Sequence, residues 1–350
     1  SWRPSNLAPD YHRNNLLTPW SNPAEPQIKF PIKPFEQLLI QLGWPDPQAW
    51  LNHWNKRGGI SLKKACWPSA IGKDWIWGLA LPFLTLLEGY LDKNGQSLVG
   101  ISGLPGCGKT SLGFWLEAVA QELEWPVVVI SLDDFYWPAP ELDRRMQGNP
   151  WGVPRALPGS HDLDLMTRTL DIWFKSGRLH TPKFDKALRS GRGDRCGWRH
   201  AKPKVLVIEG WFLGCSPYKL NKTGTFMDES FSPPLNRSEL AYRHIVKEEL
   251  KSYLAIWERF ETMWQLRALD PSYTRNWKAD QESTMQRDRG ICLDSEALEG
   301  FVRMILAAVP QACLDATPAD VMVNLNRARQ LMWVGQKGSQ VSASSESAIG

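Results

Sequence analysis

A glycine-rich stretch in the first third of the chain carries the residue types that bind phosphate. Residues 103–110 read Gly-Leu-Pro-Gly-Cys-Gly-Lys-Thr and fit the pattern G-x-x-x-x-G-K-[S/T] at every fixed position. In such a loop backbone N–H groups surround phosphate oxygens, Lys109 reaches the β- and γ-phosphates, and the Thr110 hydroxyl takes one position on Mg²⁺. The residues expected to bind ATP are Gly103, Gly106, Cys107, Gly108, Lys109, Thr110 and Ser111.

The flanking sequence supplies the strand and the helix that such a loop needs. Residues 98–102 form a short apolar run, and apolar residues recur at helical spacing from Leu112 to Leu123 without a proline. The positive end of that helix would point at the bound phosphates. The alternative is a glycine turn without a ligand, and the agreement of pattern and context argues against it.

Carboxylates follow two further apolar runs, at 127–130 and 205–208. Such continuous runs are typical of parallel strands buried on both faces, and ligands bind beyond the carboxyl ends of those strands. We predict that Asp133 and Asp134 supply a catalytic base and a carboxylate on the Mg²⁺ side, and that Glu209 also lies on the Mg²⁺ side. If the chain is still extended at the two aspartates, their side chains point to opposite sides. Adjacent carboxylates at a strand end are also common turn formers, which is the alternative.

Polar residues next to a predicted helix are the first candidates for contacts to a second substrate. Ser160 can cap a helix that runs to about Lys175. His161 and Asp162 are then either polar residues of its first turn or substrate contacts.

A basic, glycine-rich stretch at residues 190–195, Ser-Gly-Arg-Gly-Asp-Arg, is the second candidate. It is either a solvated loop or a flexible clamp. In a clamp, the guanidinium groups of Arg192 and Arg195, with Asp194 beside them, would hold a carboxylate or a phosphate.

Late arginines are candidates for a lid that neutralises charge during phosphoryl transfer. The chain predicts a helix over about 238–262, a strand over 263–269, a helix opened by residues 270–273 and a last strand at 321–323. The candidate lid residues are Arg267, Arg275 and Arg287.

Composition sets broad limits on the class of protein. The 350 residues are 43% hydrophobic and 22% charged, as in soluble globular proteins, and a net charge of +4 is too small to argue for nucleic acid. The apolar run 75–91 is short for a bilayer and contains Pro82 and Glu88, so we predict a core helix and no membrane partner. The six cysteines form no C-x-x-C pair, which favours reduced thiols and a cytoplasmic location.

These features predict one main domain with two flanking segments. We expect an α/β fold of the P-loop NTPase type, with a predominantly parallel sheet and helices on both faces. Residues 91–334 would form this domain, residues 1–90 a partly helical N-terminal extension, and residues 335–350 a flexible tail.

The motifs together resemble one family of kinases. The stretches GLPGCGKTS, SLDDFY, GSHDL, PKFDKALRSGRGDR, VIEGWFLG and LDPSYTRNW are similar to D-glycerate 3-kinases of the plant and cyanobacterial type. That family is related to phosphoribulokinase, uridine kinase and pantothenate kinase. The resemblance covers roughly residues 95–330, and residues 1–90 add nothing to it.

The resemblance implies an activity, and three alternatives remain open. It implies ATP- and Mg²⁺-dependent phosphorylation of D-glycerate to 3-phosphoglycerate in photorespiration, with the base at Asp133. One alternative is a kinase of another small alcohol, such as a nucleoside or pantothenate. A second is a nucleotide-dependent switch, although a guanine-reading N-K-x-D is missing: residues 221–224 read Asn-Lys-Thr-Gly. A third is an inactive nucleotide-binding module, which intact Lys109 and Asp133 argue against.

Overall fold

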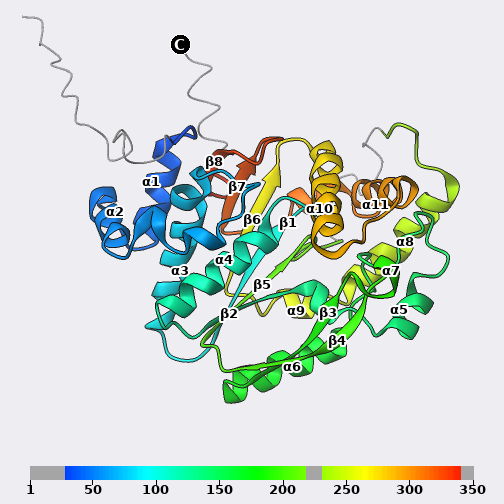
Figure 1. Cartoon of the computed structure of the whole chain (residues 1–350), viewed down its shortest axis with the longest axis horizontal. Helices are drawn as coiled ribbons and strands as arrows, with labels where there is room; N and C mark the ends of the chain where they lie inside the picture. Colours follow the sequence, from blue (N-terminus) through cyan, green and yellow to red (C-terminus); the bar gives the residue numbers. More distant parts are fainter. Residues whose placement is uncertain (1–27, 218–230, 340–350) are drawn as a thin grey trace, which may run out of the picture.

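The computed structural model describes residues 28–217 and 231–339. Within these residues the centre of the fold is a six-stranded sheet in the order β2-β5-β1-β6-β7-β8 (Figure 1). All neighbouring strands from β2 to β7 are parallel, and β8 is antiparallel to β7. The prediction of a predominantly parallel α/β sheet is confirmed. The strands are β1 (Ser97–Gly103), β2 (Val127–Ser131), β5 (Val205–Gly210), β6 (Thr262–Ala268), β7 (Val321–Leu325) and β8 (Leu331–Gln336).

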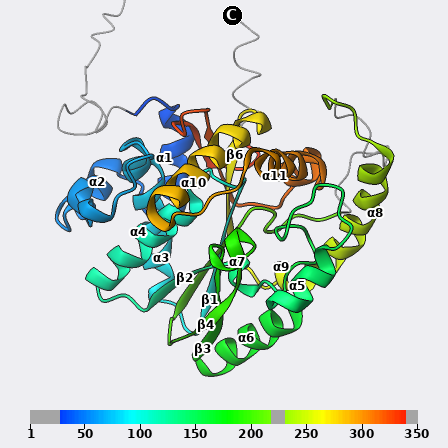
Figure 2. The ribbon, with the colours of Figure 1, turned by 45° about the vertical axis from the view of Figure 1, so that its right-hand side comes forward.

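Helices surround the sheet, since parallel strands need crossover connections. Helix α4 (Lys109–Glu122) follows the glycine-rich loop and connects β1 to β2. Figures 1 and 2 show α10 and α11 side by side near the end of the sheet at which this loop lies. The other helices of the described part are α1 (Ile32–Gln41), α2 (Pro47–Asn55), α3 (Leu81–Leu91) with a preceding π-helical turn (Ile76–Ala80), α5 (Ala139–Met146), α6 (Leu163–Ser176), α7 (Leu188–Gly191), α8 (Arg237–Lys251), α9 (Leu254–Trp257), α10 (Thr274–Arg289), α11 (Ser295–Ala307) and α12 (Gln311–Asp315).

The described residues before β1 pack into the same core as the sheet. Trp75 donates its indole N–H to the Arg329 carbonyl at 2.6 Å. Gly78 allows a close approach to β8, because a Cβ there would lie 2.5 Å from the Leu331 side chain. The boundary after residue 90 stays a prediction, and residues 1–27 of the predicted extension lie outside the described residues.

The last strand predicted from the sequence, at 321–323, is not the last one. A turn at Arg329, with φ of 60°, leads into β8, which pairs with β7. The start of β8 alternates between buried Leu331 and exposed Met332, as expected for a strand with one covered face. The predicted tail therefore begins inside β8, and residues 340–350 lie outside the described residues.

Residues 182–195 are not the open loop that the sequence suggests. They belong to a two-stranded antiparallel hairpin of β3 (Leu179–Asp185) and β4 (Asp194–Ala201), with α7 at its tip. Gly191 and Gly193 have φ of 90° and 86°, a region that favours glycine, and they make the tight return possible.

Two predicted helix boundaries also need correction. Asp162, not Ser160, caps α6, because its carboxylate accepts the Leu165 N–H at 3.0 Å while the Ser160 hydroxyl donates to the Leu157 carbonyl. The helix predicted over 238–262 is two helices, α8 and α9, and β6 already begins at Thr262. Among the described residues no helix is both long and apolar enough to cross a membrane.

Candidate functional site

The glycine-rich loop lies between β1 and the first turn of α4, as predicted. Gly106 and Gly108 have φ of 79° and 112°, which side-chain-bearing residues rarely adopt. Both are also closely covered: a Cβ on Gly106 would lie 2.7 Å from the Trp277 backbone, and a Cβ on Gly108 2.9 Å from the Trp75 ring. The loop is therefore held between α10 and the segment before β1, and α4 starts at Lys109.

Glu209, at the end of β5, contacts the two functional residues at the start of α4. Its Oε1 accepts the Thr110 hydroxyl at 2.9 Å, and its Oε2 lies 3.9 Å from the Lys109 ammonium. The sheet register places Glu209 beside Ser131 of β2, so that the carboxylates after β2 and β5 meet at one edge. Lys109 and Glu209 are both buried.

The two aspartates after β2 lie in a turn of 3₁₀-helix, Leu132–Phe135, and not in extended chain. Ser131 caps this turn by accepting the Asp133 N–H, and the Asp134 carboxylate returns to accept the Ser131 N–H at 3.1 Å. Asp134 also accepts the Phe184 N–H of β3 at 3.4 Å. Both carboxylate oxygens of Asp134 thus accept backbone N–H groups. This is the turn-forming role that the sequence left open as an alternative.

Burial also changes the acidity of Asp134. Loss of water around the carboxylate, reinforced by the negative charges of Asp133 and Glu209, raises its pKa to about 6 although two backbone N–H groups act in the other direction.

Asp133 instead faces the second substrate region. Its Oδ2 accepts from the Lys186 ammonium at 2.6 Å, and its Oδ1 lies 3.7 Å from Nε2 of His161. Burial alone would raise the pKa of Asp133, but Lys186 and His161 outweigh burial and hold it well below its ordinary value. Asp133 is therefore ionised at neutral pH.

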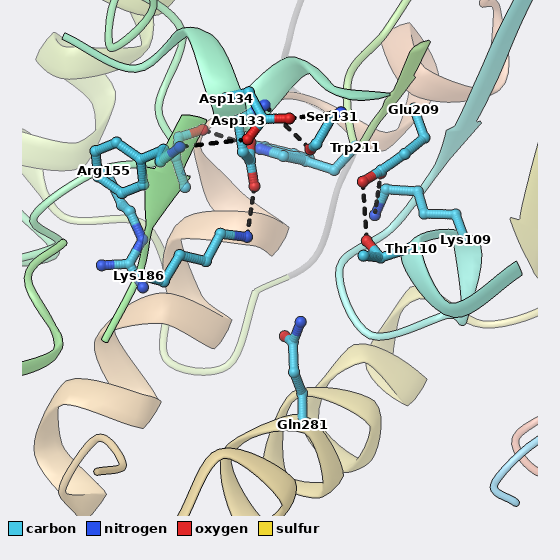
Figure 3. Close-up of polar contacts among 12 residues, drawn as sticks. Lys109, Thr110, Ser131, Asp133, Asp134, Arg155, Lys186, Glu209, Trp211 and Gln281 are labelled. Carbon is cyan, nitrogen blue, oxygen red and sulfur yellow. Dashed lines mark hydrogen bonds and ion pairs between the residues drawn. The ribbon is translucent and has the colours of Figure 1, made fainter. Parts of the chain in front are cut away.

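Two cavities meet at these residues. One, of about 200 Å³, contains the glycine-rich loop and extends to Tyr136 and Trp211. The other, of about 560 Å³, lies between α4 and the β3–β4 hairpin. Figure 3 shows Lys109, Thr110 and Glu209 on one side of this region, Asp133 and Lys186 on the other, and Gln281 reaching in from α10. The residues that line both cavities are Thr110, Asp133, Lys186, Glu209 and Gln281.

Besides Lys109, four cations line the smaller cavity, and none of them is among the predicted site residues: Arg155, Lys186, Lys278 and Arg329. Arg329 donates to the Gly106 carbonyl at 2.9 Å and so steadies the glycine-rich loop. Lys186 stands in PKFDKALRSGRGDR, one of the stretches that carry the family resemblance. Arg155 lies in an irregular segment without periodicity, so no signal in the sequence marks it.

The predicted clamp residues lie outside both cavities. Arg192 pairs with Asp143 at 3.0 Å, and Arg195 donates to the Tyr136 carbonyl at 3.1 Å. Asp194 accepts backbone N–H groups, including that of Arg195 at 2.7 Å. Their binding of substrate stays a prediction, without a cavity contact to support it.

His161 and Asp162 also lie behind the cavity surface. His161 is buried and reaches the site only through Asp133. Asp162 caps α6 and lies 3.9 Å from Arg195. Both residues therefore contact protein groups, Asp133 for His161 and Arg195 with the start of α6 for Asp162, and neither lines either cavity.

The predicted lid arginines are spread over the surface. Arg267 pairs with Asp315 at 2.8 Å, Arg275 pairs with Glu299, and Arg287 bonds within α10. None of the three lines either cavity. Their lid role stays a prediction. Two other residues of α10, Lys278 and Gln281, do line the smaller cavity.

Comparisons with known proteins agree with the motifs. No family model matches the chain. D-glycerate 3-kinase, chloroplastic, of Arabidopsis thaliana is 30% identical over 224 residues, which are 60% of this chain and 46% of that protein. An uncharacterized kinase of Schizosaccharomyces pombe, mug58, is 27% identical over 206 residues, 54% of this chain and 71% of its own length.

A solved structure shares the fold. D-glycerate 3-kinase from Cryptococcus neoformans var. grubii superposes with a TM-score of 0.60 at 24% identity, covering 73% of this chain and 96% of that one. The chain spans less than half the length of its Arabidopsis relative. The resemblance to D-glycerate 3-kinases is therefore confirmed in sequence, and the chain has the fold of the Cryptococcus kinase.

Proposed function

We propose that this chain transfers the γ-phosphoryl group of ATP to the 3-hydroxyl of D-glycerate. One observation carries the proposal: the glycine-rich loop and the Asp133 carboxylate line one small cavity in which basic side chains outnumber acidic ones. The basic residues are Lys109, Arg155, Lys186, Lys278 and Arg329, and the acidic ones are Asp133, Glu209 and Asp280. A cavity with that lining suits an anionic acceptor next to a phosphate donor. The names of the Arabidopsis and Cryptococcus relatives support D-glycerate as the acceptor.

The donor side follows from the loop geometry. The backbone N–H groups of residues 106–110 bind the phosphates, and Lys109 neutralises the charge that develops between the β- and γ-phosphates. The Thr110 hydroxyl and the Glu209 carboxylate, 2.9 Å apart, are hard oxygen ligands of the kind that Mg²⁺ takes in such sites. Mg²⁺, when bound there, would supply positive charge that neutralises part of the phosphate charge.

This donor set fits Mg²⁺ although it is small. No group of three or more His, Cys, Asp and Glu side chains suited to a metal occurs in the described part of the chain. Mg²⁺ at phosphate sites commonly uses one or two carboxylates, with waters and the substrate's own phosphates. The contacts of Asp134 favour a structural role in the turn over a place beside the metal.

Asp133 is proposed as the acceptor of the hydroxyl proton. Its low pKa makes it a weak base, and a general base works best with a pKa near the working pH. Phosphoryl transfer depends more on positioning and charge neutralisation than on proton removal, so an ionised carboxylate that orients the hydroxyl suffices. The hydroxyl must compete with Lys186 for Oδ2, so this ion pair loosens when the acceptor enters.

A kinase of a bulkier alcohol is the second candidate, because the cavity of about 560 Å³ also reaches Asp133. A panel of D-glycerate, other hydroxy acids, uridine and pantothenate, each with ATP and Mg²⁺, tests the two candidates through ADP release. Turnover with D-glycerate supports the proposal, and turnover with uridine or pantothenate but none with D-glycerate overturns it. The photorespiratory role and the cytoplasmic location are proposed from the sequence alone.

A further inference from the structure

We infer that Arg155 is the binding site for the carboxylate group of the acceptor, with Lys278 as the second cation of the same subsite. The inference rests on the proposed function, which supplies a short hydroxy acid as the acceptor. It assigns a role to two residues that neither the motifs nor the resemblance points to.

Arg155 is fixed in place by the tip of the hairpin. Its Nη1 donates to the Gly191 carbonyl at 2.7 Å and to the Arg192 carbonyl at 2.9 Å. Its guanidinium carbon lies 5.5 Å from the centre of the Phe301 ring. The Ser-Gly-Arg-Gly-Asp-Arg stretch therefore serves the acceptor site through two backbone carbonyls, which hold Arg155, and not through its own guanidinium groups.

Arg155 is buried without an anionic partner. Only 2% of the residue is exposed, and among the described residues no carboxylate forms an ion pair with it. Arginine is almost never buried unless it is paired, because a buried charge without a counter-charge is costly. In the described part of the chain only Nη1 has hydrogen-bond partners, so Nε and Nη2 remain for a ligand. These two N–H groups on one edge match the two oxygens of a carboxylate.

Lys278 comes to the same place from α10. Its ammonium lies 4.8 Å from the centre of the Phe301 ring, which the Arg155 guanidinium also faces, and it pairs with Glu282 at 3.1 Å. Burial, with repulsion from Lys186 and Arg155, lowers the pKa of Lys278 to about 8 although Glu282 opposes this. Arg155 and Lys278 both face the Phe301 ring and both line the smaller cavity, so the two cations converge on one region of it.

The charges in this region leave one positive charge without a partner. Lys186 pairs with Asp133, and Lys278 pairs with Glu282. Arg155 has no such partner, so the region is complemented by a single negative charge, which is what a monocarboxylate brings. In Figure 3 Asp133 and Arg155 lie on the side away from Lys109, and both line the smaller cavity. The acceptor hydroxyl would then lie at Asp133 and its carboxylate at Arg155.

The test compares Arg155→Ala with wild type and with Arg144→Ala, a matched control whose exposed guanidinium pairs with Glu141. D-glycerate binding without ATP is measured by calorimetry, and KM and kcat are measured for D-glycerate, ATP and the uncharged analogue glycerol. Loss of one partner of a buried charged pair costs about 2–5 kcal/mol, so we expect Arg155→Ala to weaken D-glycerate binding by about 30-fold or more. The KM for ATP and the turnover of glycerol should stay near those of wild type.

The outcomes separate the inference from the proposed function. Equal losses with D-glycerate and glycerol would mean a structural role and overturn the subsite, as would wild-type D-glycerate kinetics in Arg155→Ala. If wild type rejects D-glycerate but uses another hydroxy acid through Arg155, the proposed substrate is wrong and the subsite stands. If Arg155→Ala does not fold, Arg155→Lys is measured instead, because a lysine can keep one carbonyl contact but lacks the planar guanidinium. The KM for D-glycerate alone should then rise. An unchanged KM for D-glycerate would overturn the inference.

Discussion

Nε2 of His161 faces Oδ1 of Asp133 at 3.7 Å, and Tyr253 determines which nitrogen of the ring carries the proton. The Gly159 N–H donates to the Tyr253 hydroxyl oxygen at 3.0 Å, which leaves the hydroxyl hydrogen for Nδ1 of His161 at 2.6 Å. Burial lowers the pKa of His161, so the ring is neutral. A neutral ring that accepts at Nδ1 carries its hydrogen on Nε2, directed at Asp133.

This relationship predicts that His161 positions the base and sets its acidity. His161→Phe should lower kcat, because it removes the polar N–H that faces Oδ1 of Asp133 at 3.7 Å. It should also move the acid limb of the kcat–pH profile to higher pH, since His161 helps to lower the pKa of Asp133. Tyr253→Phe should give a smaller shift in the same direction, and an unmoved acid limb in both variants would contradict the role.

Asp133→Asn should lower kcat by about 10²–10⁴-fold with little change in the KM for ATP, as expected for a positioned general base. Asp134→Asn should cost less in kcat, because the Asp134 carboxylate bonds to the Ser131 and Phe184 N–H groups. Side-by-side kcat measurements on folded variants check this order. If Asp134→Asn is the inactive variant, the assignment is reversed.

Stability against pH gives an independent test of Asp134. Its folded-state pKa of about 6 lies above the ordinary value of 3.8, so the unfolded chain binds fewer protons between these values. The contribution of Asp134 to stability therefore falls as pH rises through this window and stays low above it. Asp134→Asn should remove this dependence, so wild type should lose stability relative to the variant as pH rises through this window. A stability difference that does not change with pH there would contradict the raised pKa of Asp134.

Lys109→Ala should abolish most of kcat while the protein stays folded. Lys109 would contact charge that shifts towards the β–γ bridge, so its loss acts mainly on the transition state. Lys175→Ala, which removes an exposed lysine at the end of α6, is the control and should behave as wild type. Near wild-type kcat with only a raised KM for ATP would assign Lys109 to ground-state binding instead.

The alkaline side of the activity profile should report on Lys278. Its pKa of about 8 means that the ammonium charge is lost as pH rises through 8. Acceptor kcat/KM should therefore fall above about pH 8, and Lys278→Arg, which keeps its charge, should move that limb upward. An alkaline limb at the same pH in both proteins would show that Lys278 does not carry it.

The donor half of the site could be predicted from the sequence because it is local. The loop pattern, the apolar runs and the carboxylates at their ends are each read within about ten residues, and the sheet register then joins Thr110 to Glu209. The acceptor half depends on contacts between distant segments. Arg155 has its role only because the carbonyl of Gly191, 36 residues later, holds it. The sequence shows the charges of Arg192 and Arg195, but it does not show that Arg192 pairs with Asp143 or that Arg195 donates to the Tyr136 carbonyl.

The position of the new phosphate tests the central claim most directly. D-glycerate labelled with ¹³C is incubated with ATP, Mg²⁺ and the protein, and the product is examined by ¹³C and ³¹P NMR. We predict that wild type gives a product in which phosphorus couples to C3 and C2 and not to C1, and that Asp133→Asn gives almost none of it. Coupling to C1, which is three bonds from phosphorus only in the 2-phosphate, would contradict the assignment of the reacting hydroxyl. No labelled phosphate ester from wild type, with turnover on another alcohol, would contradict the proposed function as a whole.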